Sequence, residues 1–254
     1  MDAPKISIIT PSFNQGSFIR QTIDSVLGQN YPNLEYIIMD GGSTDGTLDI
    51  LRSYGADLRW VSQKDNGQAD AINRGMSMVS GDILAFLNSD DYYLPGALHR
   101  VVERFAQSGC VWLTGDYRIV DQDSRKMQGF VVGYKTFWRK FSSAGLLSVL
   151  NYIIQPSTFW SRALWEAAGP LDVNLRYTMD YDFWMRAIRV APPLVVPQPL
   201  SVFRIHKTSK GGSQYVQQFD EEIQVLRRYN KSRAIDWAHR GHNALIKLAY
   251  RMMK

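Results

Sequence analysis

The stretch ILAFLNSDD, residues 83–91, joins an apolar run to two adjacent aspartates. The apolar run, residues 83–87, predicts a buried strand that ends at Asn88. Asp90 and Asp91 then stand together at the strand end, where two carboxylates repel each other unless a cation is present. A divalent ion bridging one carboxylate and a diphosphate would remove this cost. The stretch predicts a strand that ends in a charged ligand site, and the alternative is a capped loop before Pro95.

Three more strand-like runs precede this one, and helical stretches separate them. The runs are ISIIT (6–10), LEYIIM (34–39) and LRWVS (58–62); the helical stretches are 16–28, 47–52 and 68–79, with another at 95–106. Alternating strands and helices are typical of a parallel sheet covered by helices. We therefore predict an α/β fold with a Rossmann-like, mostly parallel sheet. In such folds ligands bind at the carboxyl ends of the strands.

Polar residues follow the first two predicted strands. The loop TPSFN places Pro11, Ser12 and Asn14 after the first strand, where an ordinary strand-to-helix loop is the alternative to a nucleotide contact. Asp40 ends the second strand, and a carboxylate there can accept a hydrogen bond from the imide N–H of uracil. The following GGSTDG is rich in turn residues, so a turn aspartate is the alternative for Asp40.

Two later segments carry further candidate groups. Asp65 precedes a glycine-containing loop and a helix whose start offers amides and a positive dipole end to an anion. Asp70, on the same segment, is either a second candidate or a helix-start charge. In MDYDFWMR, residues 179–186, Asp180 is the candidate general base and Asp182 is its rival or a partner for Arg186. Residues two apart on a helix do not share a face, so only one of the two aspartates is expected to be catalytic.

The ordered set of these acidic clusters resembles the family 2 glycosyltransferases, which have the GT-A nucleotide-sugar fold. The resemblance covers about residues 5–210. It implies inverting, metal-dependent transfer of a sugar from a nucleotide diphosphate donor, with UDP favoured, to an acceptor hydroxyl. A polysaccharide or lipid-linked glycan of the cell envelope is the implied acceptor class. The alternatives are a sugar-nucleotide nucleotidyltransferase, against which the chain lacks an early glycine-rich loop with Arg and Lys, and a degenerate nucleotide-binding scaffold.

The resemblance also implies roles for individual residues. NSDD, residues 88–91, is similar to the D-x-D motif, so Asp91 would ligate Mn²⁺ or Mg²⁺ and Asp90 would meet the ribose or the metal. The donor-binding set implied by the family comprises Pro11, Ser12, Asn14, Asp40, Asp65, Asn73 and Asp90. A late-chain histidine, here His206, would meet the metal or the diphosphate, with Lys207 and Lys210 adding positive charge. A plain surface role is the alternative for His206. The chain departs from the family pattern at Gly41, Asn88 and Met179.

The second half of the chain is less regular. Residues 111–116 and 117–120 are predicted strands with which 127–132 pairs, and 136–152 is a predicted helix. The segment PPLVVP, 192–197, is predicted as an edge or linker because its prolines forbid a central strand. The segment QPSTFW, 155–160, is either an acceptor-side wall or core. Glycines near 211–213 predict a boundary between a GT-A domain, 1–212, and a helical C-terminal extension, 213–254; the donor half would be about 1–115 and the acceptor half 116–212.

Charge and hydropathy limit the partners. The net charge of +5 and the pI of about 9.2 suit nucleotide diphosphates or acidic lipid head groups, but the basic residues are too few and scattered for a nucleic-acid partner. No apolar run of about 18 residues exists, and the first five residues leave no room for a signal peptide, so we expect a cytoplasmic protein, peripheral at most at the inner face of the membrane. The tail, 229–254, is a basic amphipathic helix that suits either an anionic membrane or packing on its own domain or a second subunit.

Overall fold

The computed structural model describes residues 3–127, 130–206, 209 and 215–252. Its strands are β1 (Ile6–Ser12), β2 (Leu34–Asp40), β3 (Arg59–Ser62), β4 (Ile83–Phe86), β5 (Tyr92–Tyr93), β6 (Trp112–Val120), β7 (Thr158–Ser161) and β8 (Leu194–Arg204). Its longer helices are α1 (Ile19–Leu27), α2 (Thr47–Ser53), α3 (Gln68–Ser77), α4 (Ala97–Ser108), α5 (Phe130–Arg139), α7 (Arg162–Ala168), α8 (Met179–Val190), α10 (Tyr215–Tyr229) and α11 (Arg233–Met252). Short turns of helix lie at Gly55–Asp57, at Gln155–Ser157 and at α6 (Ala144–Leu147).

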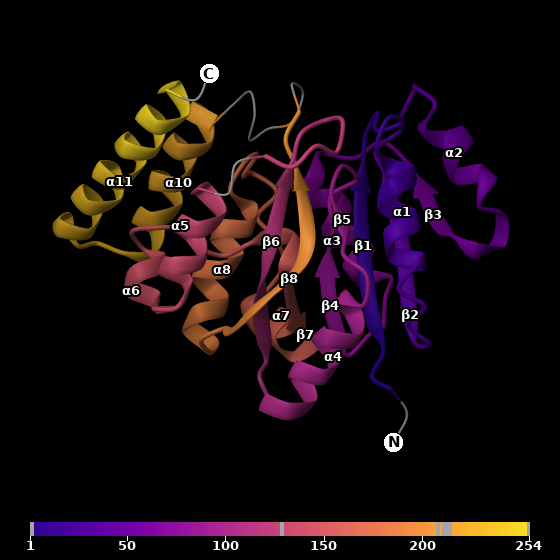
Figure 1. Cartoon of the computed structure of the whole chain (residues 1–254), viewed down its shortest axis with the longest axis horizontal. Coiled ribbons are helices and arrows are strands. Elements are labelled where there is room, and N and C mark those ends of the chain that lie inside the picture. Colours follow the sequence, from indigo (N-terminus) through magenta and orange to yellow (C-terminus); the bar gives the residue numbers. More distant parts are fainter. Residues whose placement is uncertain (1–2, 128–129, 207–208, 210–214, 253–254) are drawn as a thin grey trace.

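All eight of these strands form one sheet in the order β3-β2-β1-β4-β7-β6-β8-β5 (Figure 1). The first four in that order run parallel, so the carboxyl ends of β1, β2 and β4 meet at one edge. β7 is antiparallel to both of its neighbours, β6 and β8 are parallel, and β5 is antiparallel to β8. This mixed α/β sheet confirms the predicted fold class, and the parallel half places the predicted donor loops side by side.

The apolar residues form a core on each face of the sheet. One core contains residues of α1 and α4, and the other contains residues of α3, α7, α8 and α10. Trp112 of β6 stacks on Trp184 of α8 with ring centroids 5.7 Å apart, and Trp160 of β7 packs edge-on against Trp184. Because both faces of the central strands are covered, their sequences are nearly continuous apolar runs.

The second half corrects several sequence-based expectations. The predicted strands 111–116 and 117–120 are one strand, β6. The predicted strand 127–132 is wrong for residues 130–132, which begin α5. Val132 packs on the β6 side chains. Tyr134 and Trp138 lie four residues apart on one face of α5 and pack on the larger core. The predicted helix 136–152 is interrupted, because Ser143 caps a new short helix by accepting a hydrogen bond from Leu146 N.

The proline-rich segment 192–197 lies largely in β8 and not in a linker. Residues Leu194–Pro199 pair with β6 alone, and β5 pairs with β8 only at Ser201 and Val202. Pro197 and Pro199 therefore occupy a part of β8 that has a neighbour on one side only, where a missing N–H costs no ladder bond. The prediction that this segment lies at a sheet edge is confirmed, and the alternative that it is a linker is wrong.

The two long C-terminal helices pack beside the sheet domain. α10 contacts α8 and α11, and Figure 1 shows α11 as the outermost element at the end of the molecule opposite α2. The predicted boundary at 211–213 falls outside the described residues, so the division into two domains stays a prediction. Within the described part of the chain, no helix combines the length and apolarity needed to cross a bilayer.

Candidate functional site

Asp40 organises the loop that follows β2. Its Oδ2 accepts hydrogen bonds from Gly42 N (3.1 Å), Ser43 N (2.9 Å) and Ser62 Oγ (2.7 Å), and its Oδ1 accepts one from Ser43 Oγ at 2.5 Å. The side chain is 2% exposed. A buried carboxylate needs such donors, and these four tie the ends of β2 and β3 together. Asp40 is thus a turn aspartate in this structure, and its predicted contact with uracil stays a prediction.

The loop after β1 is joined to the same network. Asn14 N donates to Ser43 Oγ at 2.7 Å, and Asn14 Oδ1 accepts from Thr44 N at 2.9 Å. Asn14 has a φ of +52°, a conformation that asparagine tolerates better than most residues. Pro11 and Ser12 are buried at the end of β1, and Ser12 Oγ has no hydrogen-bond partner among the described residues.

Phe13 is a residue that the sequence interpretation missed. It stands between Ser12 and Asn14, and its side chain is 59% exposed at the carboxyl edge of the sheet. Large aromatic rings are normally buried, so an exposed ring surrounded by polar loops offers a stacking surface. The signal in the sequence was an aromatic residue inside an otherwise polar strand-end loop.

Gly41 makes room for Asp65. A Cβ atom placed on Gly41 would lie 2.7 Å from Asp65 Oδ2, so the absent side chain lets this carboxylate approach the end of β2. Asp65 Oδ1 accepts from Gly67 N at 2.8 Å, next to the start of α3. Asp70 instead accepts from Asn66 N at 3.0 Å, as expected of a helix-start charge. The departure at Gly41 therefore brings the Asp40 loop and Asp65 together.

The acid pair lies at the end of β4. Asp91 is 0% exposed, and its Oδ1 accepts from Arg204 N at 2.9 Å. Asp90 is more exposed, and its Oδ2 lies 3.0 Å from His206 Nε2. Burial, with the adjacent Asp90 carboxylate, raises the pKa of Asp91 well above its usual range. Burial is the larger cause, and the adjacent carboxylate adds the repulsion that the sequence predicted for two acids at a strand end.

Arg204 ties this pair to two distant segments, one at Gln122–Ser124 and one at Gln21. Its Nε donates to Asp90 O at 3.0 Å, and its guanidinium also bonds Gln122 O (3.2 Å), Ser124 Oγ (3.1 Å) and the Gln21 side chain. The side chain is 2% exposed. A rigid fork with five donors can hold several carbonyls at once, which a lysine cannot do. The sequence interpretation missed Arg204, although it stands two residues before His206 in the same segment.

The donor set fits a divalent cation held partly by a substrate. Asp90 Oδ2 and His206 Nε2 face each other, and carboxylate oxygen and imidazole nitrogen are both ligands for Mn²⁺. Within the described residues, no three His, Cys, Asp or Glu side chains converge as a complete protein cage. Mg²⁺ in particular is commonly bound by one or two carboxylates together with substrate phosphates and water. The residues present suit that mode, with Asp91 buried behind the facing pair.

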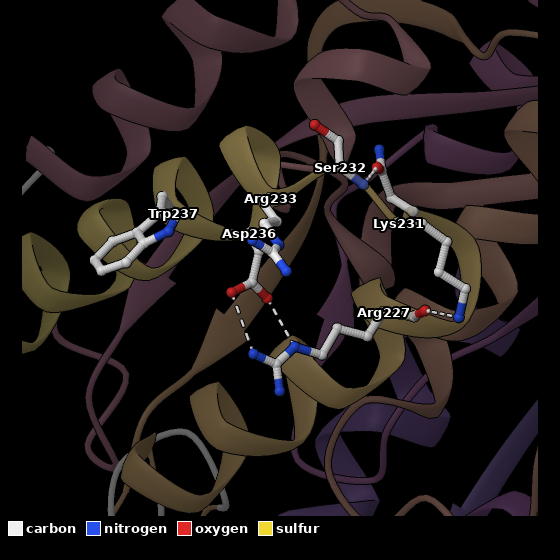
Figure 2. A pocket seen from close by; sticks show the side chains of 7 residues that line it. Arg227, Lys231, Ser232, Arg233, Asp236 and Trp237 are labelled. Atoms are coloured by element: carbon white, nitrogen blue, oxygen red, sulfur yellow. Dashed lines mark hydrogen bonds and ion pairs between the residues drawn. The ribbon is translucent and has the colours of Figure 1, made fainter.

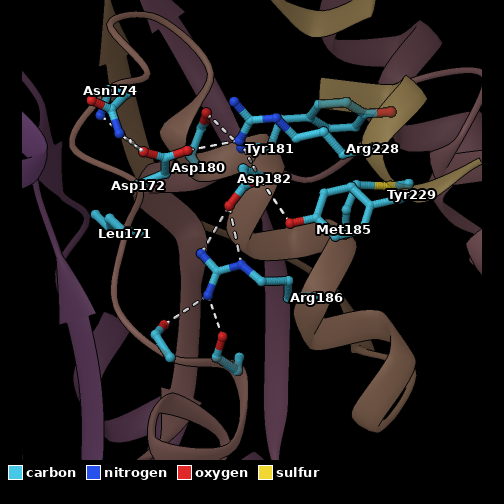
Figure 3. A network of polar contacts seen from close by, with 12 residues as sticks. Leu171, Asp172, Asn174, Asp180, Tyr181, Asp182, Met185, Arg186, Arg228 and Tyr229 are labelled. Atoms are coloured by element: carbon cyan, nitrogen blue, oxygen red, sulfur yellow. Dashed lines mark hydrogen bonds and ion pairs between the residues drawn. The ribbon is translucent and has the colours of Figure 1, made fainter. Parts of the chain in front are cut away.

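Asp182 is structural, as the alternative interpretation held. Figure 3 shows its carboxylate between Arg186, whose Nε and Nη2 atoms lie 3.0 Å away, and the Tyr229 hydroxyl, 2.7 Å away. Asp182 is buried and fully engaged in linking α8 to α10. Asp180 is mostly buried but keeps some exposure, and its Oδ1 accepts from Tyr181 N at 2.8 Å. Of the two aspartates, Asp180 is the one with an oxygen left for a substrate proton.

Two side chains from other helices act on Asp180. Burial raises the pKa of Asp180 to about 6, with Glu222 of α10 adding to the rise and Lys135 of α5 opposing it. Burial in turn lowers the pKa of Lys135. Neither residue could be linked to Asp180 from the sequence, because each lies on a different helix far away along the chain.

Asn73 and the segment 155–160, both predicted to lie at the site, make mainly structural contacts. The Asn73 amide is engaged at both ends by Leu171, donating to its O and accepting from its N at 2.9 Å each, so it anchors α3 to the segment before α8. Residues 156–160 are buried, which makes Phe159 and Trp160 core and leaves only Gln155, bonded to Asn88 at 3.2 Å, near the acid pair. Lys207 and Lys210 lie outside the described residues.

Comparison with known proteins places this geometry in a family. The model of Glycosyl transferase family 2 matches residues 7–163, and the chain belongs to this family. An uncharacterized glycosyltransferase of Rickettsia typhi is 29% identical over 208 residues, which cover 80% of this chain and 65% of that protein. The chain therefore spans just under two thirds of this relative.

Solved structures share the fold. S. aureus TarS in complex with UDP-GlcNAc superposes with a TM-score of 0.70 at 18% identity, over 91% of this chain and 69% of that one. The mannosyltransferase PcManGT from Pyrobaculum calidifontis, in complex with GDP-Man and Mn²⁺, gives a TM-score of 0.68 at 17% identity, over 94% of this chain and 69% of that one. These likenesses confirm the predicted GT-A fold.

Replacing Arg204 tests its role in holding the acid pair. Arg204→Lys keeps the charge but loses the fork, so the carbonyls and the Gln21 side chain lose buried donors. We expect a loss of about 1–3 kcal/mol in the free energy of unfolding, measured by urea titration. The exposed Arg52→Lys is the matched control and should change stability by less than about 0.5 kcal/mol. Equal stability of the two variants would contradict this role.

Proposed function

We propose that this chain transfers a sugar, with inversion, from a nucleotide diphosphate sugar to an acceptor hydroxyl, with a UDP-sugar as the favoured donor. The single observation that carries the proposal is the contact between the partly exposed Asp90 and the buried His206, 3.0 Å apart, at the end of β4, which pairs with β1. Family membership and the donors named for the two structural neighbours, UDP-GlcNAc and GDP-Man, support it.

The donor would lie along that edge. The exposed Phe13 ring offers a stacking face for the base, and Asp65 lies close to Gly41 at the end of the neighbouring strand β2. The diphosphate would then reach the acid pair, where Asp90, His206 and Asp91 would hold Mn²⁺ or Mg²⁺. When bound, such an ion supplies positive charge that stabilises the departing nucleoside diphosphate. The Mn²⁺ complex of the Pyrobaculum neighbour supports this assignment.

Asp180 would act as the general base. It removes the proton from the acceptor hydroxyl while that oxygen attacks the anomeric carbon opposite the diphosphate, which inverts the configuration. A carboxylate with a pKa of about 6 is mostly ionised at neutral pH and is still a better proton acceptor than an ordinary aspartate. The acceptor would be a polysaccharide or lipid-linked glycan, and a lipid-linked acceptor would require peripheral contact with the cytoplasmic face of the membrane.

Nucleotide binding tests the donor and metal assignments together. UDP, GDP and dTDP are titrated calorimetrically into the protein with and without Mn²⁺. We expect UDP to bind most tightly and only with Mn²⁺ present, and His206→Gln or Asp90→Asn to weaken the Mn²⁺-dependent binding roughly 10- to 100-fold. Asp123→Asn, at an exposed acid paired with Arg125, is the control. The same nucleotide affinity with and without Mn²⁺ in the wild-type protein would contradict the metal assignment.

The pH dependence of transfer tests Asp180. Its carboxylate is the active form and its pKa is raised, so kcat/KM should fall about tenfold per pH unit below a pKa of about 6. Asp180→Asn should abolish transfer and retain nucleotide binding. Glu222→Gln removes a nearby negative charge and should move the acid limb to lower pH, whereas Glu166→Gln, at an exposed site, should not. Loss of nucleotide binding in Asp180→Asn, or an acid limb unmoved in Glu222→Gln, would refute the assignment.

A further inference from the structure

The fully exposed positions on α11 between Arg233 and Leu245 are apolar, small or cationic, and none of them is acidic. Trp237 is 75% exposed and Leu245 is 68% exposed. The other exposed positions on this stretch are Arg233, Ala234, Ala238, Arg240, Gly241 and Ala244. The opposite face buries His239 and Asn243 against the protein, so the outward face is accessible from Arg233 to Leu245.

A pocket of about 320 Å³ lies where α10 turns into α11, at the start of this face (Figure 2). Its lining includes the cationic Arg227, Lys231 and Arg233, one acid, Asp236, and Trp237. Asp236 is bonded by Arg227 Nε at 2.7 Å and by Arg240 Nε at 2.9 Å, so its charge is already compensated. Lys231 Nζ donates to Arg227 O, and the Arg233 guanidinium has no partner among the residues that the structure describes. The pocket therefore presents uncompensated positive charge next to an exposed indole.

We infer that this surface, defined as the α10–α11 pocket together with the outward face of α11, docks the protein on an anionic lipid bilayer. Lys231 and Arg233 would bind headgroup phosphates, while Trp237 and Leu245 enter the boundary between headgroups and acyl chains. Indole rings favour that boundary because one end is apolar and the N–H can remain hydrated. Basic amphipathic helices bind anionic bilayers through this combination of apolar area and positive charge.

The charge distribution favours a bilayer over a second copy of the chain. A two-fold symmetric contact would place the same patch on both sides, so Lys231 and Arg233, which no acid compensates among the described residues, would face a cationic patch of the partner. An anionic bilayer supplies the missing negative charge. Docking here would also be connected to the site, because Glu221 of α10 accepts hydrogen bonds from Tyr177 N (2.7 Å) and Thr178 N (2.8 Å), just before Asp180.

Only the use of this surface, to bring the enzyme to a lipid-linked acceptor, rests on the proposed function. The docking itself does not, so the two can fail separately. Docking is measured by co-sedimentation of the full chain with phosphatidylcholine vesicles, with and without phosphatidylglycerol. We expect binding only with phosphatidylglycerol. Lys231→Glu with Arg233→Glu should weaken binding by about tenfold or more, and Trp237→Ala should also weaken it.

The control double variant, Arg52→Glu with Arg59→Glu, changes the net charge equally at the opposite end of the molecule and should keep vesicle binding. All variants should keep the nucleotide affinity of the parent protein. Equal vesicle binding by the pocket and control variants would overturn the inference. Competition by inorganic phosphate beyond that of sodium chloride at equal ionic strength would assign the pocket to a soluble phosphate instead. A dimer in sedimentation equilibrium that Trp237→Ala abolishes would assign the face to a second copy.

Discussion

The burial of Asp91 beside Asp90 is the constraint on which the site depends. Two carboxylates at the end of one strand, one of them fully buried, are costly without compensating charge or donors. The fold meets this cost in part through Arg204, whose backbone N–H bonds Asp91 and whose side chain bonds the Asp90 carbonyl. The same segment brings His206 to Asp90. In the proposed function, a bound cation would offset the cost that remains.

The first half of the fold could be predicted from the sequence because its signals are local. Each apolar run of β1, β2 and β4 ends in a polar loop, and the order of strands and helices determines that these loops meet at one edge. The second half could not be predicted as well. Val132, Tyr134 and Trp138 follow a helical period, but a short apolar run there is equally compatible with a strand, and only packing on β6 and the core decides between them.

The same distinction applies to the site residues. The ends of β1, β2 and β4 indicated Asn14, Asp40 and Asp90, and the structure brings them to the same edge. Arg204, Glu222 and Lys135 were missed because their importance comes from contacts between distant segments. Asn73 was selected by its position in a motif, but its amide hydrogen-bonds the Leu171 backbone through both its nitrogen and its oxygen. Asp40 shows that a residue selected as a ligand contact can also organise a loop, since its carboxylate bonds Gly42, Ser43 and Ser62.

The most direct test of this account asks whether a bound cation touches the Asp90–His206 pair. Pulsed electron paramagnetic resonance of Mn²⁺ bound with the preferred nucleoside diphosphate detects nitrogen in the metal's coordination shell. We predict a nitrogen coupling in the wild-type protein that His206→Gln removes and that His99→Gln, at an exposed histidine, leaves unchanged. Mn²⁺ bound with the nucleotide but without a nitrogen coupling, or a coupling that persists in His206→Gln, would contradict the account.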